Sequence, residues 1–468
     1  MSRNQSHFLN TFFYPQSVAV VGATNNTSTL NYNLFGNLVN LKFPGRIYPV
    51  NPRAKEIMGI KAYPDLKSIE GEVDLAIVAV PASKALDVVR DCVARKVKGV
   101  VLVSGGFSEI GEGGRRVQDE IKRLLQENGI RATGPNTLGP INSANNFVVS
   151  FRAVERLVPG KLSFIFQSGL YDPRINWMVS EFGLRLSKLI DLGNKMDTTE
   201  TDALEYLGQD PETGVIAIHL ESIAGDGRKF LRLLKQICRE KPVIILKSAR
   251  TPAGAKAAAS HTGAIIRSSD AVFDTVMKQS GAIRAQTLDD LFDLGKVFEY
   301  LYPITGNRVH VSTGPGGEGV LATDLCQYNG LSMAQLNAET YEKLRAIFPS
   351  WNMTVNPFDL GVSIQFNDVT SVFNVMLTAV PDDPNVDCLA MQVRLDRFKD
   401  ADRFITLITD SIKRGKPVVL WMTVMPHGND TIIQRLESHQ IPVYPSGDRA
   451  IKALAALYKY GKWREGRE

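Results

Sequence analysis

Short apolar runs alternate with amphipathic stretches along most of this chain. In the first 140 residues, five runs rich in Val and Ile end at Gly, Pro or Asn and predict buried strands, at 17–23, 46–52, 73–81, 99–106 and 130–136. Between them, apolar residues recur at helical spacing over 84–96 and 114–129. An alternation of buried strands and helices predicts a parallel sheet with helices on both faces, which is a doubly wound α/β fold.

The same alternation occurs twice more. A second set of strands is predicted at 161–169, 186–194, 214–222 and 241–249, and a third at 308–317, 386–393, 416–423 and 441–447. A chain of 468 residues is also too long for a single hydrophobic core. We therefore predict three consecutive doubly wound domains, at residues 1–145, 158–300 and 307–465.

Composition narrows the class of protein. Apolar residues make up 44% and charged residues 22%, which is typical of soluble globular proteins. The net charge of +5 is not gathered in a basic block, so we expect no nucleic-acid partner. The four cysteines are scattered without CxxC spacing, which predicts neither a metal site nor a disulfide scaffold and fits the cytoplasm. No signal peptide and no run of 18 apolar residues is seen, so we expect no membrane segment.

The first predicted domain favours a ligand that carries phosphate. Ligands of such sheets bind at the carboxyl ends of the strands. The turn that begins at Gly22 lacks the further glycines of a dinucleotide fingerprint. Arg53 and Lys55 follow the second strand, where an NAD site usually has an acidic residue. Basic side chains there favour a phosphorylated ribose, as in NADP or coenzyme A, unless both are solvated surface charges.

One histidine lies among small residues in the second predicted domain. His261 is in AAASHTGA (257–264), a run that we interpret as a mobile loop. A histidine there could be a ligand, a general base, a nucleophile or a satisfied polar group. Glu221 follows a buried strand and could bond one imidazole nitrogen, and the turn 167–169 offers a helix N-terminus for phosphate. Together they suggest a phosphohistidine relay, with His219, inside the strand, as a second candidate.

An ordered set of motifs covers nearly the whole chain. It includes VAVVGATNN, YPVNP, SGGFSEIGEGG, GPNTLGPIN, DLGNKMD, AAASHTGA and GPGGEGVLATD. In this order the motifs resemble the α subunit of NDP-forming acyl-CoA synthetases, also called ADP-forming acetyl-CoA synthetases, which are related to succinyl-CoA synthetase. The resemblance implies a Rossmann-like CoA-binding domain and two flavodoxin-like ligase-CoA domains. It also implies an ATP-grasp β subunit that binds ADP or ATP with Mg, in a heterotetramer.

The resemblance further implies a reaction and the residues that carry it out. Acyl-CoA, phosphate and ADP would be interconverted with a carboxylic acid, CoA and ATP. His261 would be the phosphorylated histidine and Glu221 its hydrogen-bond partner. Coenzyme A would contact residues at the strand ends of the first domain: Gly22, Ala23, Thr24, Asn51, Arg53, Val80, Pro81, Ser104, Gly105 and Asn136. Phosphate would bind at two glycine-rich turns: Gln167, Ser168, Gly169, Gly316 and Gly317.

The sequence departs from the family pattern in two places. Small residues usually follow the QSG turn, whereas LYDPR follows it here. Asp172 and Pro173 predict an N-cap and a first-turn proline, which would place a carboxylate near the phosphate, with Arg174 to compensate. Thr137 replaces the cysteine of the family's GPNCLG. Because LYDPR alters the pocket, a non-catalytic CoA-binding regulatory protein is the alternative function. The first domain leaves an NADP-dependent oxidoreductase as a third hypothesis.

Overall fold

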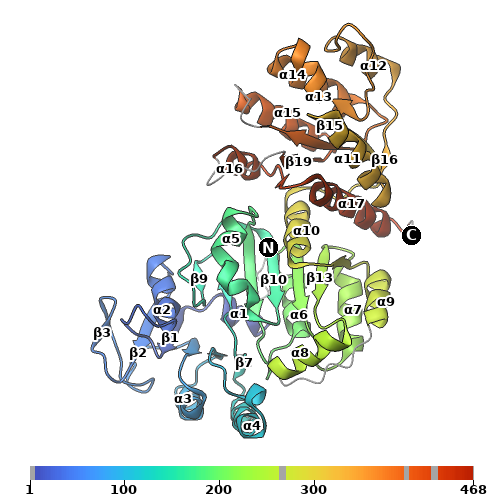
Figure 1. Ribbon diagram of the computed structural model, residues 1–468. Coiled ribbons are helices and arrows are strands. Elements are labelled where there is room, and N and C mark those ends of the chain that lie inside the picture. The colour runs from blue at the N-terminus through green and yellow to red at the C-terminus, as the bar shows by residue number, and fades with distance from the viewer. Residues whose placement is uncertain (1–5, 263–269, 395–399, 423–430, 467–468) are drawn as a thin grey trace. The chain divides into compact units, whose positions relative to one another are not determined.

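The computed structural model describes residues 6–262, 270–394, 400–422 and 431–466. The chain divides into two compact units, Met1–Leu291 and Phe292–Glu468. Both units consist of largely parallel sheets with helices packed against them (Figure 1). The predicted α/β class is therefore confirmed.

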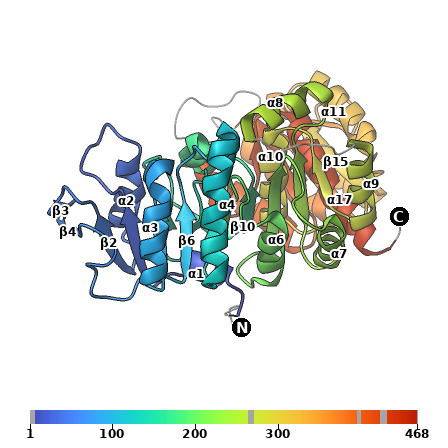
Figure 2. The same ribbon diagram turned by 90° about the horizontal axis from the view of Figure 1, so that it is seen from below.

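The first sheet of unit 1 has five parallel strands in the order β2-β1-β5-β6-β7. Each coincides with a predicted strand: β1 Ser17–Val21, β2 Arg46–Val50, β5 Leu75–Val78, β6 Gly99–Leu102 and β7 Arg131–Thr133. The remaining elements are α1 Leu9–Phe13, α2 Asn31–Asn40, the hairpin β3 Glu56–Ile57 and β4 Ile60–Lys61, α3 Ala82–Ala94, the 3-10 turn η1 Ser108–Ile110 and α4 Glu112–Glu127. Figure 2 shows α3 and α4 side by side against this sheet.

The second sheet of unit 1 has seven strands in the order β14-β13-β12-β10-β11-β8-β9. Its central strands were predicted, and the short ones were not: β8 Ile141–Asn142, β9 Phe147–Val148, β10 Pro159–Phe166, β11 Leu186–Asp191, β12 Val215–Leu220, β13 Val243–Lys247 and β14 Ile283–Ala285. Within this sheet, β8 pairs antiparallel with β11 and β9 pairs antiparallel with β8, while the other described pairs are parallel. The helical elements are η2 Gly169–Arg174, α5 Ile175–Ser180, α6 Glu200–Gln209, α7 Gly227–Ile237, α8 Pro252–Thr262 and α9 Asp270–Ser280. Helix α10, Leu288–Tyr300, begins in unit 1 and continues into unit 2.

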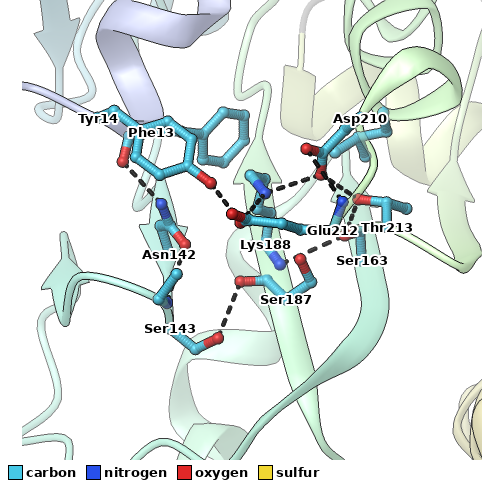
Figure 3. Close-up of polar contacts among 12 residues, drawn as sticks. Phe13, Tyr14, Asn142, Ser143, Ser163, Ser187, Lys188, Asp210, Glu212 and Thr213 are labelled. Carbon is cyan, nitrogen blue, oxygen red and sulfur yellow. Dashed lines mark hydrogen bonds and ion pairs between the residues drawn. The ribbon is translucent and has the colours of Figure 1, made fainter. Parts of the chain in front are cut away.

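A buried ion-pair cluster ties this sheet to the turn after α6 (Figure 3). The Nζ atom of Lys188, a fully buried residue of β11, lies 2.7 Å from Asp210 Oδ2 and 3.0 Å from Glu212 Oε2. Thr213 donates a further hydrogen bond of 2.6 Å to Asp210 Oδ2. Burial alone would lower the pKa of Lys188, but the facing carboxylates outweigh it and raise the pKa. Lys188 is therefore protonated, and it forms an ion pair with each of the two carboxylates, Asp210 and Glu212.

The sheet of unit 2 is parallel, in the order β16-β15-β18-β19-β20, with β17 also paired to β15. Its strands are β15 Arg308–Thr313, β16 Ser332–Met333, β17 Phe358–Asp359, β18 Cys388–Val393, β19 Val418–Met422 and β20 Val443–Tyr444. Its helices are α11 Gly316–Tyr328, α12 Ala338–Arg345, α13 Leu360–Phe366, α14 Val369–Asp382, α15 Ala401–Lys413, α16 Thr431–Ser438 and α17 Gly447–Arg464. Strand order reverses beside β15, because β16 lies on one side of it and β18 on the other.

Candidate active site

The predicted CoA-binding residues follow the five strands of the first sheet, so they lie along its carboxyl edge. Two hydrogen bonds join neighbouring loops of this edge. Asn51 Nδ2 donates to Ala23 O at 2.8 Å, and the backbone N–H of Asn136 donates to Ser104 O at 3.0 Å. These bonds hold the loop after β2 against that after β1, and the loop after β7 against that after β6. Arg53 is exposed beside Asn51.

The turn after β1 must approach the end of β5 closely. Gly22 has a φ of +96°, and a Cβ at this position would lie 2.4 Å from Ala79 O. Asn31, the first residue of α2, donates from Nδ2 to the same carbonyl at 2.8 Å. Both residues lie where the strand order reverses between β1 and β5, the place where open α/β sheets bind ligands. Sequence analysis missed Asn31, since its contact depends on how α2 is placed.

Gln167 connects the end of β10 to the end of β12. Its Oε1 atom accepts hydrogen bonds from Glu221 N at 2.8 Å, Ser222 N at 3.1 Å and Lys195 Nζ at 3.0 Å. Its Nε2 atom lies 3.5 Å from Glu221 Oε2. The structure thus brings together two residues predicted for different roles, Gln167 and Glu221, both buried.

Lys195 is a buried cation at this junction that the sequence analysis missed. Its Nζ atom also lies 3.1 Å from Glu200 Oε2 and 2.7 Å from Ser222 O. Burial lowers the pKa of Lys195, although Glu200 and Glu221 oppose the shift. Lys195 belongs to the motif DLGNKMD, which was noted only as part of the ordered set.

The predicted loop around His261 is wrong in its secondary structure. Pro252–Thr262 forms the helix α8, because alanine is the strongest helix former and proline is favoured at the first helical position. The side chain of His261 lies outside the described part of the structure. Helix α8 as a whole lies close to η1, which follows β6 at the edge of the first sheet.

His219, the second candidate, is an interior residue of β12. Its Nε2 atom lies 2.6 Å from Ser248 Oγ. Burial, together with the charge of Lys195, lowers its pKa to about 4. His219 is therefore a neutral histidine at physiological pH.

A cavity of about 240 Å³ lies between the two sheets of unit 1. Its walls combine the turn after β7, the QSG turn and the turn after β11: Val103, Asn136, Thr137, Leu138, Phe151, Gln167, Ser168, Gly169, Asp191, Gly193 and Asn194. Asn136, predicted for CoA, thus shares one cavity with Gln167, Ser168 and Gly169, predicted for phosphate.

Asp191, at the end of β11, is a fully buried carboxyl group in this cavity wall. Its Oδ1 accepts a hydrogen bond from Gly193 N and its Oδ2 one from Leu138 N, both at 3.1 Å. The Thr137 hydroxyl donates to Asp191 O at 2.6 Å, so the threonine has a defined partner. Burial raises the pKa of Asp191 to about 7, even though both N–H groups stabilise the ionised form. Its charge therefore changes near neutral pH.

The LYDPR segment does not place Asp172 in this cavity. Residues 169–174 form the 3-10 turn η2 with Pro173 inside it, and α5 begins only at Ile175. Asp172 is therefore not an N-cap: it is buried, and the Ser150 hydroxyl donates a hydrogen bond to it. Arg174 is exposed and donates to Leu170 O. The carboxyl group in the cavity wall is Asp191 instead.

The second predicted phosphate turn lies in unit 2. Gly316 is the first residue of α11, and a Cβ there would lie 2.7 Å from Asp359 Oδ2. Gly317 has open space beside it. A cavity of about 380 Å³ adjoins this turn and is lined by the two preceding residues, Gly314 and Pro315.

Neither a metal site nor a membrane-spanning helix is found in residues 6–262, 270–394, 400–422 and 431–466. No group of three His, Cys, Asp or Glu side chains there is placed to hold a metal ion. No helix in these ranges has the length and apolar character needed to cross a membrane.

Comparisons with known proteins agree with this architecture. Residues 16–143 match the CoA binding domain family, and residues 159–298 match the succinyl-CoA ligase like flavodoxin domain family. A CoA-binding sheet followed by this flavodoxin-like sheet defines an acid–thiol ligase of the succinyl-CoA ligase type.

Full-length relatives define the family. The chain is 35% identical to the α subunit of ADP-forming acetate–CoA ligase II of Pyrococcus furiosus, over 97% of this chain and 98% of that one. It is also 35% identical to ADP-forming acetate–CoA ligase II of Archaeoglobus fulgidus, covering 67% of that longer protein. The structure of Ca. Korarchaeum cryptofilum dinucleotide forming acetyl-coenzyme A synthetase 1 in complex with phosphate and ADP matches with a TM-score of 0.87 and 32% identity, over 98% of both chains. The chain belongs to the family of ADP-forming acyl-CoA synthetases and corresponds to their α subunit, as the resemblance predicted.

Proposed function

We propose that this α subunit, with an ATP-grasp β subunit, interconverts acyl-CoA, phosphate and ADP with a carboxylic acid, CoA and ATP through a phosphohistidine at His261. The observation that carries the proposal is the cavity of unit 1, in which Asn136 and the QSG turn share one wall. A thioester held at the first sheet and a phosphate held at the QSG turn would meet there.

CoA would bind along the carboxyl edge of the first sheet. Gly22 lets the turn after β1 approach the end of β5 at the point where the strand order reverses, which is where a ligand of this sheet would bind. The exposed guanidinium of Arg53 would pair with the ribose phosphate, and Ser104 and Asn136 would line the path toward the cavity.

Phosphate would bind at the turn formed by Gln167, Ser168 and Gly169. A phosphate oxygen attacks the thioester carbonyl, the C–S bond breaks, and CoA leaves as a thiolate that takes up a proton. An imidazole nitrogen of His261 then attacks the phosphorus atom, and the acid leaves as a carboxylate. Glu221 would accept a hydrogen bond from the other imidazole nitrogen and stabilise the charged ring.

The second half of the reaction requires the partner subunit. ADP or ATP with Mg would bind on the β subunit, in a cytoplasmic heterotetramer. Gly316 and Gly317 would offer a second phosphate position. In this proposal residues 1–145 bind CoA, residues 158–300 carry the phosphohistidine, and residues 307–465 form the second ligase-CoA domain.

Labelling of the histidine tests the proposal directly. The full chain, co-purified with its ATP-grasp subunit, is incubated with γ-³²P-ATP and Mg. We expect an acid-labile label that is absent in His261→Ala. His439→Ala is the matched control, because His439 is exposed on unit 2 and should leave labelling unchanged.

Two results would contradict the relay. A label that survives His261→Ala would place the phosphoryl group elsewhere. CoA binding by a chain that never becomes labelled would favour the non-catalytic regulatory protein.

A further inference from the structure

Asp191 lies in the wall of the unit 1 cavity, between the parts that would hold the two reactants. It is the last residue of β11, and the same wall contains Asn136, predicted for CoA, and Gly169, predicted for phosphate. A Cβ built on Gly169 would lie 3.6 Å from Asp191 Oδ2. This oxygen therefore faces the space beside the QSG turn, where phosphate is proposed to bind.

The backbone holds this carboxyl group in place. Its Oδ1 accepts from Gly193 N and its Oδ2 from Leu138 N, and a carboxyl oxygen has two lone pairs, so these bonds leave one on each oxygen. The turns that supply the two N–H groups are themselves bonded together, since Asn194 N donates to Pro135 O at 2.9 Å. A lone pair of Asp191 Oδ2 is thus available at a fixed position to carry a proton or to bond a ligand.

The surroundings of Asp191 favour its neutral form. The residue is fully buried, and burial raises its pKa to about 7. Tyr171 and Asp172 are the titratable side chains that face it from η2, and the charge of Asp172 raises the pKa of Asp191 further. The turns GPNTL at 134–138 and QSG at 167–169 contain no titratable side chain. A group that titrates near neutral pH can both donate and accept a proton there.

The proposed reaction requires one proton to move between its two reactants. When the phosphate dianion, HPO₄²⁻, attacks the thioester carbonyl, the C–S bond breaks and its electron pair goes to sulfur. The acyl phosphate that forms has lost the proton of the phosphate, and the CoA thiolate gains one proton to become a thiol. One proton therefore leaves a phosphate oxygen and one reaches sulfur, so the step balances without any further co-reactant.

We propose that Asp191 is the acid–base group that transfers this proton. Its carboxyl O–H donates to sulfur as the C–S bond breaks, and the resulting carboxylate takes up the proton that the phosphate oxygen releases. In the opposite direction the carboxylate removes the proton from the CoA thiol. The inference rests on the proposed function, because it assigns a catalytic residue to the thioester step of that reaction.

Trapping with hydroxylamine separates the thioester step from the steps that make the acyl phosphate. The full chain with its ATP-grasp subunit is supplied with ATP, Mg and a mixture of acetate, 2-methylpropanoate and phenylacetate at pH 7. Without CoA, hydroxylamine converts the acyl phosphate to a hydroxamate; with CoA and without hydroxylamine, the thioester is measured. Asparagine cannot carry the proton, so in Asp191→Asn we expect thioester formation to slow by about 100-fold or more and hydroxamate formation to change less than about threefold.

A matched variant and a pH profile complete the test. Asp172→Asn is the control, since Asp172 is a buried carboxyl group that is bonded by Ser150 and does not line the cavity. It should change the ratio of thioester to hydroxamate less than about threefold. The carboxylate of Asp191 is the form that accepts the thiol proton, so kcat/KM of the wild type for CoA should fall about tenfold per pH unit below about pH 7. Asp191→Asn should lack this dependence.

The outcomes separate this inference from the proposed function. Equal slowing of hydroxamate and thioester in Asp191→Asn would make Asp191 a structural or phosphate-binding residue and overturn the inference. Thioester formation by Asp191→Asn at the wild-type rate, or a pH dependence that persists in this variant, would assign the proton transfer to another group. Absence of histidine labelling, or of both products, in the wild type would instead refute the proposed function itself.

Discussion

Asp191→Asn changes the one carboxyl group that lines the cavity of unit 1. The carboxyl is fully buried, and burial raises its pKa from an ordinary value of 3.8 to about 7. The folded state therefore holds a proton on this group at pH values at which the unfolded chain has released it. As the pH rises from about 4 to about 7, the unfolded state binds fewer protons than the folded state, so stability falls with increasing pH.

The size of this effect follows from the shift. Each unit of pKa difference corresponds to about 1.4 kcal/mol, so the wild type should lose about 4 kcal/mol of unfolding free energy between pH 4 and pH 7 because of Asp191. Asparagine does not ionise, so the variant lacks this loss. It has a single acceptor oxygen, so one of the hydrogen bonds from Leu138 N and Gly193 N is lost, at about 1 kcal/mol. At pH 8 the variant should be more stable than the wild type by about 3 kcal/mol, and at pH 4 less stable by about 1 kcal/mol.

Urea unfolding followed by circular dichroism at pH 4, 5, 6, 7 and 8 measures the difference. Asp119→Asn is the matched control, because it removes an exposed carboxylate and should leave the pH dependence unchanged. Parallel curves for Asp191→Asn and the wild type would refute the reasoning, since Asp191 would then take up no proton on folding.

Asp191→Asn should also alter how the affinity for phosphate depends on pH. Gly169 lies beside this carboxyl group, since a Cβ on Gly169 would be 3.6 Å from Asp191 Oδ2. A negative charge there opposes an anion at the QSG turn. Phosphate affinity of the wild type should therefore fall above pH 7, and the fall should be smaller in Asp191→Asn.

Three further substitutions have defined outcomes. Lys188→Ala leaves Asp210 buried without its cation and should lower the free energy of unfolding by about 3–5 kcal/mol in urea titrations. Gly361→Ala places a Cβ 1.9 Å from Gly314 O and should cost about 1–3 kcal/mol in the same measurement. Lys195→Met removes one of the three hydrogen bonds to Gln167 Oε1 and should slow labelling of the histidine by about tenfold or more, with CoA affinity unchanged.

The two stability variants, Lys188→Ala and Gly361→Ala, each have a control in the same chain. Lys229→Ala breaks an exposed ion pair with Glu205 and should cost less than about 1 kcal/mol. Gly317→Ala adds a Cβ in open space within α11 and should be neutral or stabilising by up to about 1 kcal/mol. Lys188→Ala no more damaging than Lys229→Ala would contradict the account of the buried cluster. Labelling of Lys195→Met at the wild-type rate would exclude a positioning role.

Continuous apolar runs predict the long strands of this protein well because most of their residues are buried on both faces, as throughout β11 and β12. The short strands β8 and β9 have two residues each, too few for any periodic signal. Helix α8 was predicted as a loop because its small residues were interpreted as a sign of mobility, whereas its alanines in fact favour a helix. The amino-acid composition therefore drew attention to the segment around His261, but the secondary structure inferred from it was wrong.

Candidate residues at strand ends were found because glycine-rich turns are visible in sequence. Asp191 and Lys195 were missed as individual residues, since their roles depend on burial and on partners distant in sequence, such as Leu138, which is 53 residues from Asp191. The sequence likewise pointed to Asp172 as the unfavourable carboxylate, because it follows the QSG turn directly. Folding turns Asp172 toward Ser150 and places Asp191 in the cavity instead.

Each of the two cavities has a buried glutamine that makes the same type of hydrogen bond, but the surroundings of its amide nitrogen differ. In each, a buried glutamine at a strand end accepts a hydrogen bond from a backbone N–H group at the end of the neighbouring strand: Gln167 from Glu221, and Gln392 from Gly314. This bond fixes the turn on which a ligand would rest. At Gln167 the remaining amide nitrogen faces Glu221 Oε2, so its wall is completed by a carboxylate. At Gln392 no carboxylate plays this part, and the side chain lines the mostly apolar cavity of unit 2.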